Sequence, residues 1–116
     1  HSSLLAIEAE KLLKCEDIFA EVIDVRVLNP FHVGGIIESV KKTKNLLVID
    51  SGWISGGFSA EVIAKVVEEL PKDCLRNPPL RVALPDAPAP TSRVLEKAYY
   101  TSTDDVIKAV KKILNN

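Results

Sequence analysis

An almost wholly apolar run, Asn45 to Asp50 (NLLVID), constrains the fold of this chain more than any other segment. Strands with one face in water carry polar residues at alternate positions, whereas strands buried on both faces of a parallel sheet are apolar throughout. A glycine-rich loop, Ser51 to Gly57, follows this run and leads into a helical pattern that Pro71 ends. The apolar stripe of that helix is Val62, Ile63, Val66, Val67 and Leu70. Strand, loop and helix in this order predict a unit of a parallel α/β sheet.

Two more elements are predicted before this unit. Residues 3 to 15 have the spacing of an amphipathic helix, and the β-branched run EVIDVRVL (21 to 28) predicts a strand. Asn29 then predicts the N-cap, and Pro30 the first residue, of a helix that runs to about Lys42. The apolar stripe predicted for the first helix is Leu5, Ala9, Leu12 and Leu13.

After the unit, the run LRVAL (80 to 84) predicts a short strand, and a last helix follows. Ser102, with Asp105 three residues later, indicates a capping box at the start of that helix. Its inward residues are predicted to be Val106, Ile107, Val110 and Leu114.

Helices that alternate with strands predict an α/β fold, a three-layer α/β/α sandwich with a mainly parallel sheet. A chain of 116 residues fits one domain, residues 1 to 116. Three evident strands make a thin sheet for four or five helices, and the sequence begins on a helix. We therefore expect a strand before His1 that these residues lack.

The composition argues against several classes of function. Fifteen basic and sixteen acidic residues nearly cancel, so a nucleic-acid partner is not expected, and no apolar run approaches the roughly 20 residues of a membrane span. Cys15 and Cys74 lie far apart, outside any metal-binding or disulfide pattern. No signal peptide is evident, and we expect a protein of the cytoplasm, or of the mitochondrial matrix if eukaryotic.

The Ser51 to Gly57 loop lies where α/β folds bind phosphates, between a strand and a helix N-terminus. It matches neither the dinucleotide fingerprint nor a P-loop, so we favour a structural role in which the glycines permit tight turns. Trp53 and Phe58 would then fill an interface. Glu61, in the first helical turn, complements the helix dipole more simply than it serves catalysis. Asp50 is a lone carboxylate, and His32 has no serine or cysteine nearby to activate.

A stiff proline-spaced segment, Asp86 to Pro90 (DAPAP), follows the last predicted strand. It suits either a docking surface or a rigid connector. Arg26 and Arg93 are candidates for ion pairs across a subunit contact.

Several of these segments together resemble one family, the C-terminal domain of the β subunits of thiamine-diphosphate-dependent 2-oxo acid dehydrogenases (the E1 component), which is shared with transketolases. The resemblance covers essentially the whole chain in the family's order. At His32 the family commonly has an acidic residue, and family members have a strand before the position of His1. The segments that carry the resemblance are EVIDVR with Pro30, SVKKT at 39 to 43, Gly52-Trp53 to Gly57-Phe58, Ala60-Glu61-Val62, Arg81-Val82, DAPAP, Leu95-Glu96 and the helix from Ile107 to Leu114.

The resemblance implies a non-catalytic domain. Thiamine diphosphate and Mg²⁺ belong to the parent enzyme, which decarboxylates pyruvate or a branched-chain 2-oxo acid and passes the acyl group to lipoyl. No residue of this chain is expected to be catalytic or to bind a cofactor or metal. The implied partners are the preceding pyrimidine-binding domain, the second β subunit, the α subunit and the subunit-binding domain of the acyltransferase. The interface candidates are Arg26, Trp53, Phe58, Glu61, Asp86, Pro88, Pro90, Arg93 and Asn116.

The sequence leaves three other interpretations open. The chain could be a free-standing α/β domain that binds a nucleotide or flavin at the Gly52 to Gly57 loop. It could be the corresponding domain of a transketolase or a deoxyxylulose-phosphate synthase. A domain of a 2-oxo acid:ferredoxin oxidoreductase is the third.

Overall fold

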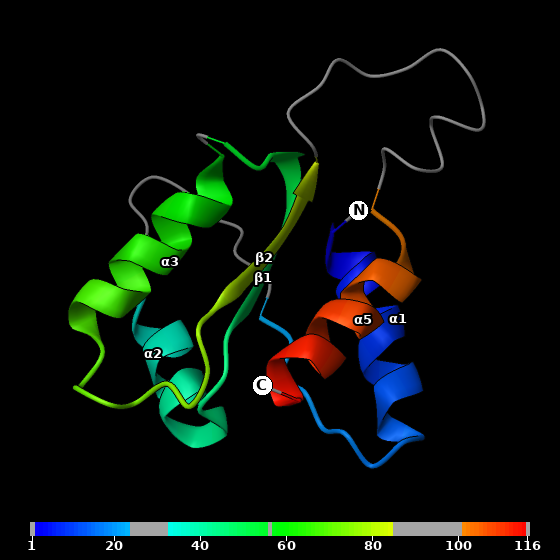
Figure 1. The fold of residues 1–116 in the computed structure, drawn as a ribbon, viewed down its shortest axis with the longest axis horizontal. Helices are drawn as coiled ribbons and strands as arrows, with labels where there is room; N and C mark the ends of the chain where they lie inside the picture. Colours follow the sequence, from blue (N-terminus) through cyan, green and yellow to red (C-terminus); the bar gives the residue numbers. More distant parts are fainter. Residues whose placement is uncertain (1, 24–32, 56, 85–100, 116) are drawn as a thin grey trace.

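A computed structural model of the chain describes residues 2–23, 33–55, 57–84 and 101–115. Its helices and strands follow in the order α1 (Ser2–Lys14), α2 (Gly34–Thr43), β1 (Leu47–Trp53), α3 (Phe58–Glu69), β2 (Leu80–Leu84) and α5 (Thr103–Leu114). In Figure 1, α2 and α3 lie on one side of the strands, and α1 and α5 lie on the other. The three-layer arrangement predicted from the sequence is therefore confirmed.

The sheet of the described residues consists of β1 and β2, which pair in parallel. Leu47 pairs with Leu80 and Ile49 with Val82, and the register then shifts before Trp53 pairs with Leu84. The predicted short strand at 80 to 84 is confirmed. The strand predicted at 45 to 50 is also present, but it begins at Leu47 and continues to Trp53.

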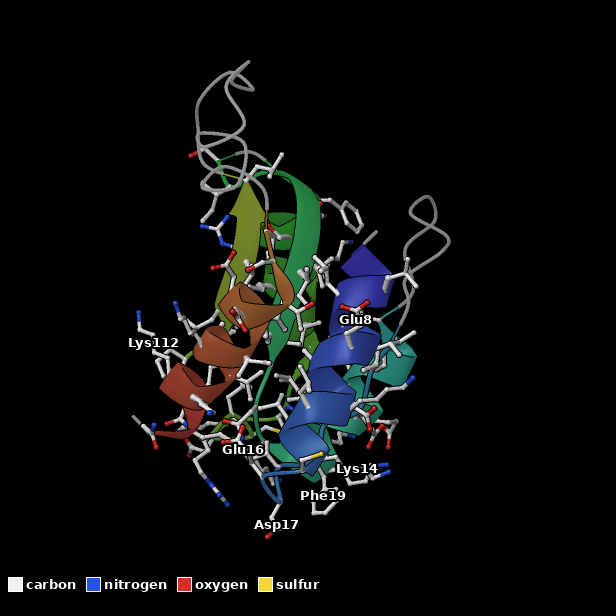
Figure 2. All side chains as sticks on the ribbon, turned by 90° about the vertical axis from the view of Figure 1, so that its right-hand side faces the viewer. Glu8, Lys14, Glu16, Asp17, Phe19 and Lys112 are labelled. Atoms are coloured by element: carbon white, nitrogen blue, oxygen red, sulfur yellow. The ribbon has the colours of Figure 1, made fainter. Side chains whose placement is uncertain are left out.

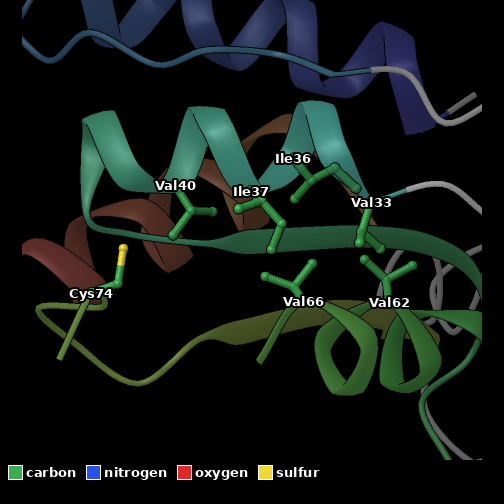
Figure 3. Packing of buried hydrophobic residues seen from close by; sticks show 7 residues of the cluster. All are labelled: Val33, Ile36, Ile37, Val40, Val62, Val66 and Cys74. Carbon is green, nitrogen blue, oxygen red and sulfur yellow. The ribbon is translucent and has the colours of Figure 1, made fainter. Parts of the chain in front are cut away.

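The main core lies between α2, α3 and the sheet (Figure 3). Side chains from both helices meet there, and Val66 of α3 is fully buried. Each such side chain stabilises the fold by about 1.5–3 kcal/mol through removal of apolar surface from water. The buried cluster consists of Val33, Ile36, Ile37, Val40, Val62, Val66 and Cys74.

A second contact joins α1 and α5 on the opposite side of the sheet, where the two helices lie side by side (Figure 2). Ala9 and Leu13 are buried on α1, as are Val106 and Ile113 on α5. Two polar contacts lie at the rim: Thr103 Oγ1 donates to Glu8 Oε2 at 2.8 Å, and Lys111 Nζ lies 3.0 Å from Glu16 Oε1.

The capping box predicted for the last helix is confirmed. The Ser102 hydroxyl accepts from the Asp105 amide, and the Asp105 carboxylate accepts from the Ser102 amide at 2.9 Å. Both bonds satisfy amides that the first turn of a helix leaves without a partner.

Three predicted stripe residues are exposed and correct the helical patterns. Leu12 of α1, Val67 of α3 and Leu114 of α5 are 52%, 49% and 46% exposed. Each belongs to the apolar spacing of its helix, but among the described residues the two strands and one neighbouring helix cover only a narrow strip of that face.

Two predicted boundaries also change. The second helix begins at Gly34 and not at Pro30; its N-cap is Val33, which buries its side chain in the core and offers no capping oxygen. Residues 21 to 23, the described part of the predicted strand 21 to 28, form no strand, and residues 24 to 32 lie outside the described ranges. The Ile37 amide, which donates to the Val33 carbonyl at 2.9 Å, makes the first helical bond.

Candidate functional site

A cavity of about 730 Å³ runs along β1. Its lining comes from every layer: α1, residues 17–23, α2, β1, α3 and α5. Most of the lining is apolar, and typical contributors are Leu13, Val40, Ile49 and Val110. We call this space the β1 groove. It is large enough to count among ordinary ligand or segment sites.

The N-terminus of α3 forms the polar end of the groove. Its N-cap, Gly57, has no side chain to offer, and the carboxylate of Asp50 replaces the missing cap from the middle of β1. Asp50 Oδ2 accepts from the Ser59 amide at 2.9 Å. A carboxylate at this end of a helix also complements the macrodipole, so the site that an anion would occupy already holds one.

The hydroxyl of Ser59 is the one buried side-chain polar atom in the described part of the chain that has no hydrogen-bond partner. The residue is fully buried and lines the groove. A buried hydroxyl without a partner loses its hydrogen bonds to water and gains none in the protein, which lowers the stability of the fold by about 1–3 kcal/mol.

The predicted glycine-rich loop from Ser51 to Gly57 is shorter in the structure, because Ser51, Gly52 and Trp53 continue β1. The Ile54 amide donates to the Leu84 carbonyl at 2.8 Å, and Arg81 Nη1 donates to the Ile54 carbonyl at 2.5 Å. These bonds tie the connection to β2.

Phe58 and Glu61 lie in the first turn of α3. Phe58 is partly buried and packs against the core cluster. Glu61 is exposed, at the positive end of the helix dipole. Their role in an interface, like that of Trp53, stays a prediction.

The other sequence candidates fall outside the described ranges. They are Arg26, His32, Asp86, Pro88, Pro90, Arg93 and Asn116. Their proposed contacts stay predictions.

One charged contact was missed by the sequence reasoning. Glu21 Oε2 lies 2.6 Å from Lys42 Nζ and ties the segment after α1 to the end of α2. The hydrogen bond from Lys42 lowers the pKa of the Glu21 carboxyl below its ordinary value, against a smaller opposing effect of desolvation. Nothing in the sequence links two opposite charges 21 positions apart, so no local signal could have found the pair.

In the described ranges, no three His, Cys, Asp or Glu side chains lie close enough together to hold a metal ion. The same ranges contain no helix with the length and apolar character needed to cross a bilayer.

Large apolar side chains stand on the outer surface of α1 and on the segment that follows it. Leu4 is 65% exposed and Phe19 is 72% exposed, and Ile7 and Leu12 are exposed between them. Phe19 projects away from the body of the domain just beyond the end of α1 (Figure 2). Single exposed apolar residues are ordinary, but several on one element are typical of an interaction surface.

Residues 3–106 match the protein family described as "Transketolase, C-terminal domain". Among curated proteins, the chain is 41% identical over 110 residues to the pyruvate dehydrogenase E1 component subunit beta of Caenorhabditis elegans, which is mitochondrial; the match covers 95% of the chain and 31% of that protein. The subunit beta of Rickettsia bellii is 43% identical over 94% of the chain and 33% of its own length. The mitochondrial subunit of Mus musculus is 38% identical over 94% and 30%. The chain thus spans about a third of the length of these relatives.

Proposed function

Since the chain belongs to the transketolase C-terminal domain family, we propose that it serves as the C-terminal domain of the β subunit of a pyruvate dehydrogenase E1 component, and that its work there is assembly and not catalysis. The observation that carries this proposal is the similarity along nearly the whole chain to three such subunits, which are the mitochondrial proteins of Caenorhabditis elegans and Mus musculus and the bacterial protein of Rickettsia bellii. We favour pyruvate over a branched-chain 2-oxo acid as the substrate of the parent enzyme, because all three relatives are named as subunits of pyruvate dehydrogenase.

The state of the α3 N-terminus supports a role without a cofactor. A diphosphate bound directly at this helix N-terminus would lie close to the Asp50 carboxylate, which already accepts from the Ser59 amide. The repulsion between these like charges supports the proposal that the diphosphate is bound elsewhere. We propose that the cofactor and Mg²⁺ are held by other parts of the parent enzyme, which lies in the cytoplasm or the mitochondrial matrix.

The outer surface of α1 supports the assembly role. Leu4 and Phe19 keep most of their surface in water, and removal of that surface at a subunit contact stabilises the contact by about 25 cal/mol per Å². The proposed partners are the preceding pyrimidine-binding domain, the second β subunit, the α subunit and the subunit-binding domain of the acyltransferase. Trp53, Glu61 and the 86 to 90 segment are the other proposed contacts.

Calorimetric titration of thiamine diphosphate with Mg²⁺ into the folded chain tests the absence of a cofactor role. We expect no saturable heat. Saturable binding that Asp50→Asn strengthens would contradict the proposal, because it would place the diphosphate at the α3 N-terminus.

The assembly role is tested in the full-length β subunit, expressed together with its α subunit. Phe19→Ser removes an exposed apolar side chain beyond α1, and Val67→Ser removes one from α3 on the other side of the sheet. Sedimentation velocity should show assembly weakened about tenfold by Phe19→Ser and unchanged by Val67→Ser. Equal assembly in wild type and both variants would exclude Phe19 from the subunit contact.

A further inference from the structure

The buried apolar side chains of the described residues form two separate groups. The main cluster lies between α2, α3 and the sheet, and Ile37 of α2 belongs to it. Ala9 and Leu13 of α1 and Val106 and Ile113 of α5 are buried as well, but none of these four belongs to that cluster. They lie on the two helices that pack side by side on the other side of the sheet (Figures 1 and 2). The helix pair therefore has a small core of its own.

The face of the sheet toward this helix pair is covered incompletely. Val48 packs against the main cluster, and neighbouring side chains of a strand point to opposite faces, so Leu47 and Ile49 point toward α1 and α5. Both are only partly buried, and both line the β1 groove together with side chains of α1 and α5. A side chain beside an open space lacks dispersion contacts on that side. The pair therefore gains less from its contact with the sheet than closely packed helices would.

Two polar contacts join α1 to α5 and not to the sheet. Thr103 Oγ1, at the start of α5, donates to Glu8 Oε2 at 2.8 Å, and Lys111 Nζ, near its end, lies 3.0 Å from Glu16 Oε1. The helices have 13 and 12 residues, and isolated helices of this length are marginal in water. When one helix of the pair is lost, the other therefore loses much of its support.

We propose that α1 and α5 form one cooperative unit, which separates from the sheet and unfolds together while α2, α3, β1 and β2 stay folded. Folded proteins open in such units, and the units with few buried apolar contacts open at a lower free energy than the whole chain. The pair acts as a lid, because its opening exposes Leu47 and Ile49 at the β1 groove to water. This inference does not rest on the proposed function, since it concerns the packing of the chain itself.

Native-state hydrogen exchange of the 116-residue chain in low concentrations of urea tests the unit amide by amide. We expect the slowest amides of α1 and of α5 to follow one common opening equilibrium. That opening should be populated at least about tenfold more than the opening that exposes the amides of Val40 and Val66 in the main core. A single opening shared by all four helices, or separate openings for α1 and α5, overturns the inference.

Two matched substitutions distinguish opening of the lid from unfolding of the whole chain. Ile113→Val removes one buried methyl group from the helix pair, and Ile37→Val removes one from the main cluster. Because Ile113 loses its contacts when the lid opens, Ile113→Val should speed exchange in α1 and α5 by about two- to tenfold. Ile37 keeps its contacts in the open state, so Ile37→Val should leave exchange in both helices unchanged. Equal acceleration of α1 and α5 by the two variants would mean that these helices exchange only when the whole chain unfolds, and would overturn the inference.

Discussion

The carboxylate of Asp50 caps a helix that begins eight residues further along the chain, through a 2.9 Å hydrogen bond from the Ser59 amide. The bond links the middle of β1 to the first turn of α3, so it fixes the helix against the strand as well as satisfying a helical amide. It also places a carboxylate beside the positive end of the helix dipole at this strand-to-helix junction.

Replacement of Asp50 by Ala should therefore destabilise the chain. A lost cap costs about 1–2 kcal/mol, and the charge complement to the helix dipole is lost with it. Urea denaturation followed by circular dichroism should show a lower midpoint for Asp50→Ala and a smaller change for Asp50→Asn, which keeps an acceptor. Glu68→Gln, exposed near the other end of α3, is the matched control. A stability of Asp50→Ala equal to that of the control would mean that the bond contributes nothing.

The capping box at Ser102 is a local counterpart of the same interaction. Ser102→Ala should cost about 1 kcal/mol, because it removes the acceptor for the Asp105 amide. Ser102→Asp should restore most of that loss, since aspartate is also a favoured N-cap. The urea midpoints of wild type, Ser102→Ala and Ser102→Asp measure these differences. If Ser102→Asp does not regain the stability lost in Ser102→Ala, the loss comes from packing and not from capping.

These two caps differ in how far sequence reasoning could find them. Ser102 and Asp105 are three residues apart, and their spacing alone predicts the box. Asp50 and Ser59 meet only because β1 and α3 fold back on each other, and the glycine at the N-cap position carries no sign of a distant substitute. The same limit applies to Glu21 and Lys42, which tertiary folding brings together.

The elements themselves were largely predictable, because their signal is periodic. The burial of individual residues within an element was less predictable. The spacing of α3 places Val66 and Val67 in one apolar stripe, but the elements that pack against the helix decide which of the two side chains is buried. The extension of β1 through Gly52 to Trp53 was also missed. Gly52 lies in the register shift between Ile49 and Trp53, where a strand tolerates glycine, and Trp53 then pairs with Leu84 of β2.

Adjacent valines on α3 provide a direct test of this distinction. Val66 is fully buried in the core cluster and Val67 is 49% exposed. Val66→Ala should lower the free energy of unfolding by about 2 kcal/mol through lost burial and a residual cavity. Val67→Ala should change it by no more than about 0.5 kcal/mol. Chemical denaturation of both variants measures the difference, and comparable losses would contradict the packing of α3.

The Glu21–Lys42 pair predicts a dependence of stability on pH. The pKa of Glu21 is lower in the folded chain than its ordinary value of 4.5, so its contribution is complete above that value and is lost as pH falls through the folded pKa. The difference in urea midpoint between wild type and Glu21→Gln should be positive at neutral pH and should shrink below pH 4.5. High salt should shrink it too, because both side chains are exposed. A difference that does not change with pH would exclude the ion pair as its cause.

The unpaired hydroxyl of Ser59 leads to the opposite kind of prediction, a substitution that stabilises. Because this oxygen is fully buried without a partner, Ser59→Ala removes a desolvated polar group while it keeps the Cβ and the amide that Asp50 caps. We expect the chain to gain about 1 kcal/mol in its free energy of unfolding. Ser59→Val has a different expected outcome, because its larger side chain must also fit the packed junction of α3 and β1. If Ser59→Ala destabilises the chain, the hydroxyl has a partner in solution, and hydrogen exchange of the neighbouring amides would then locate it.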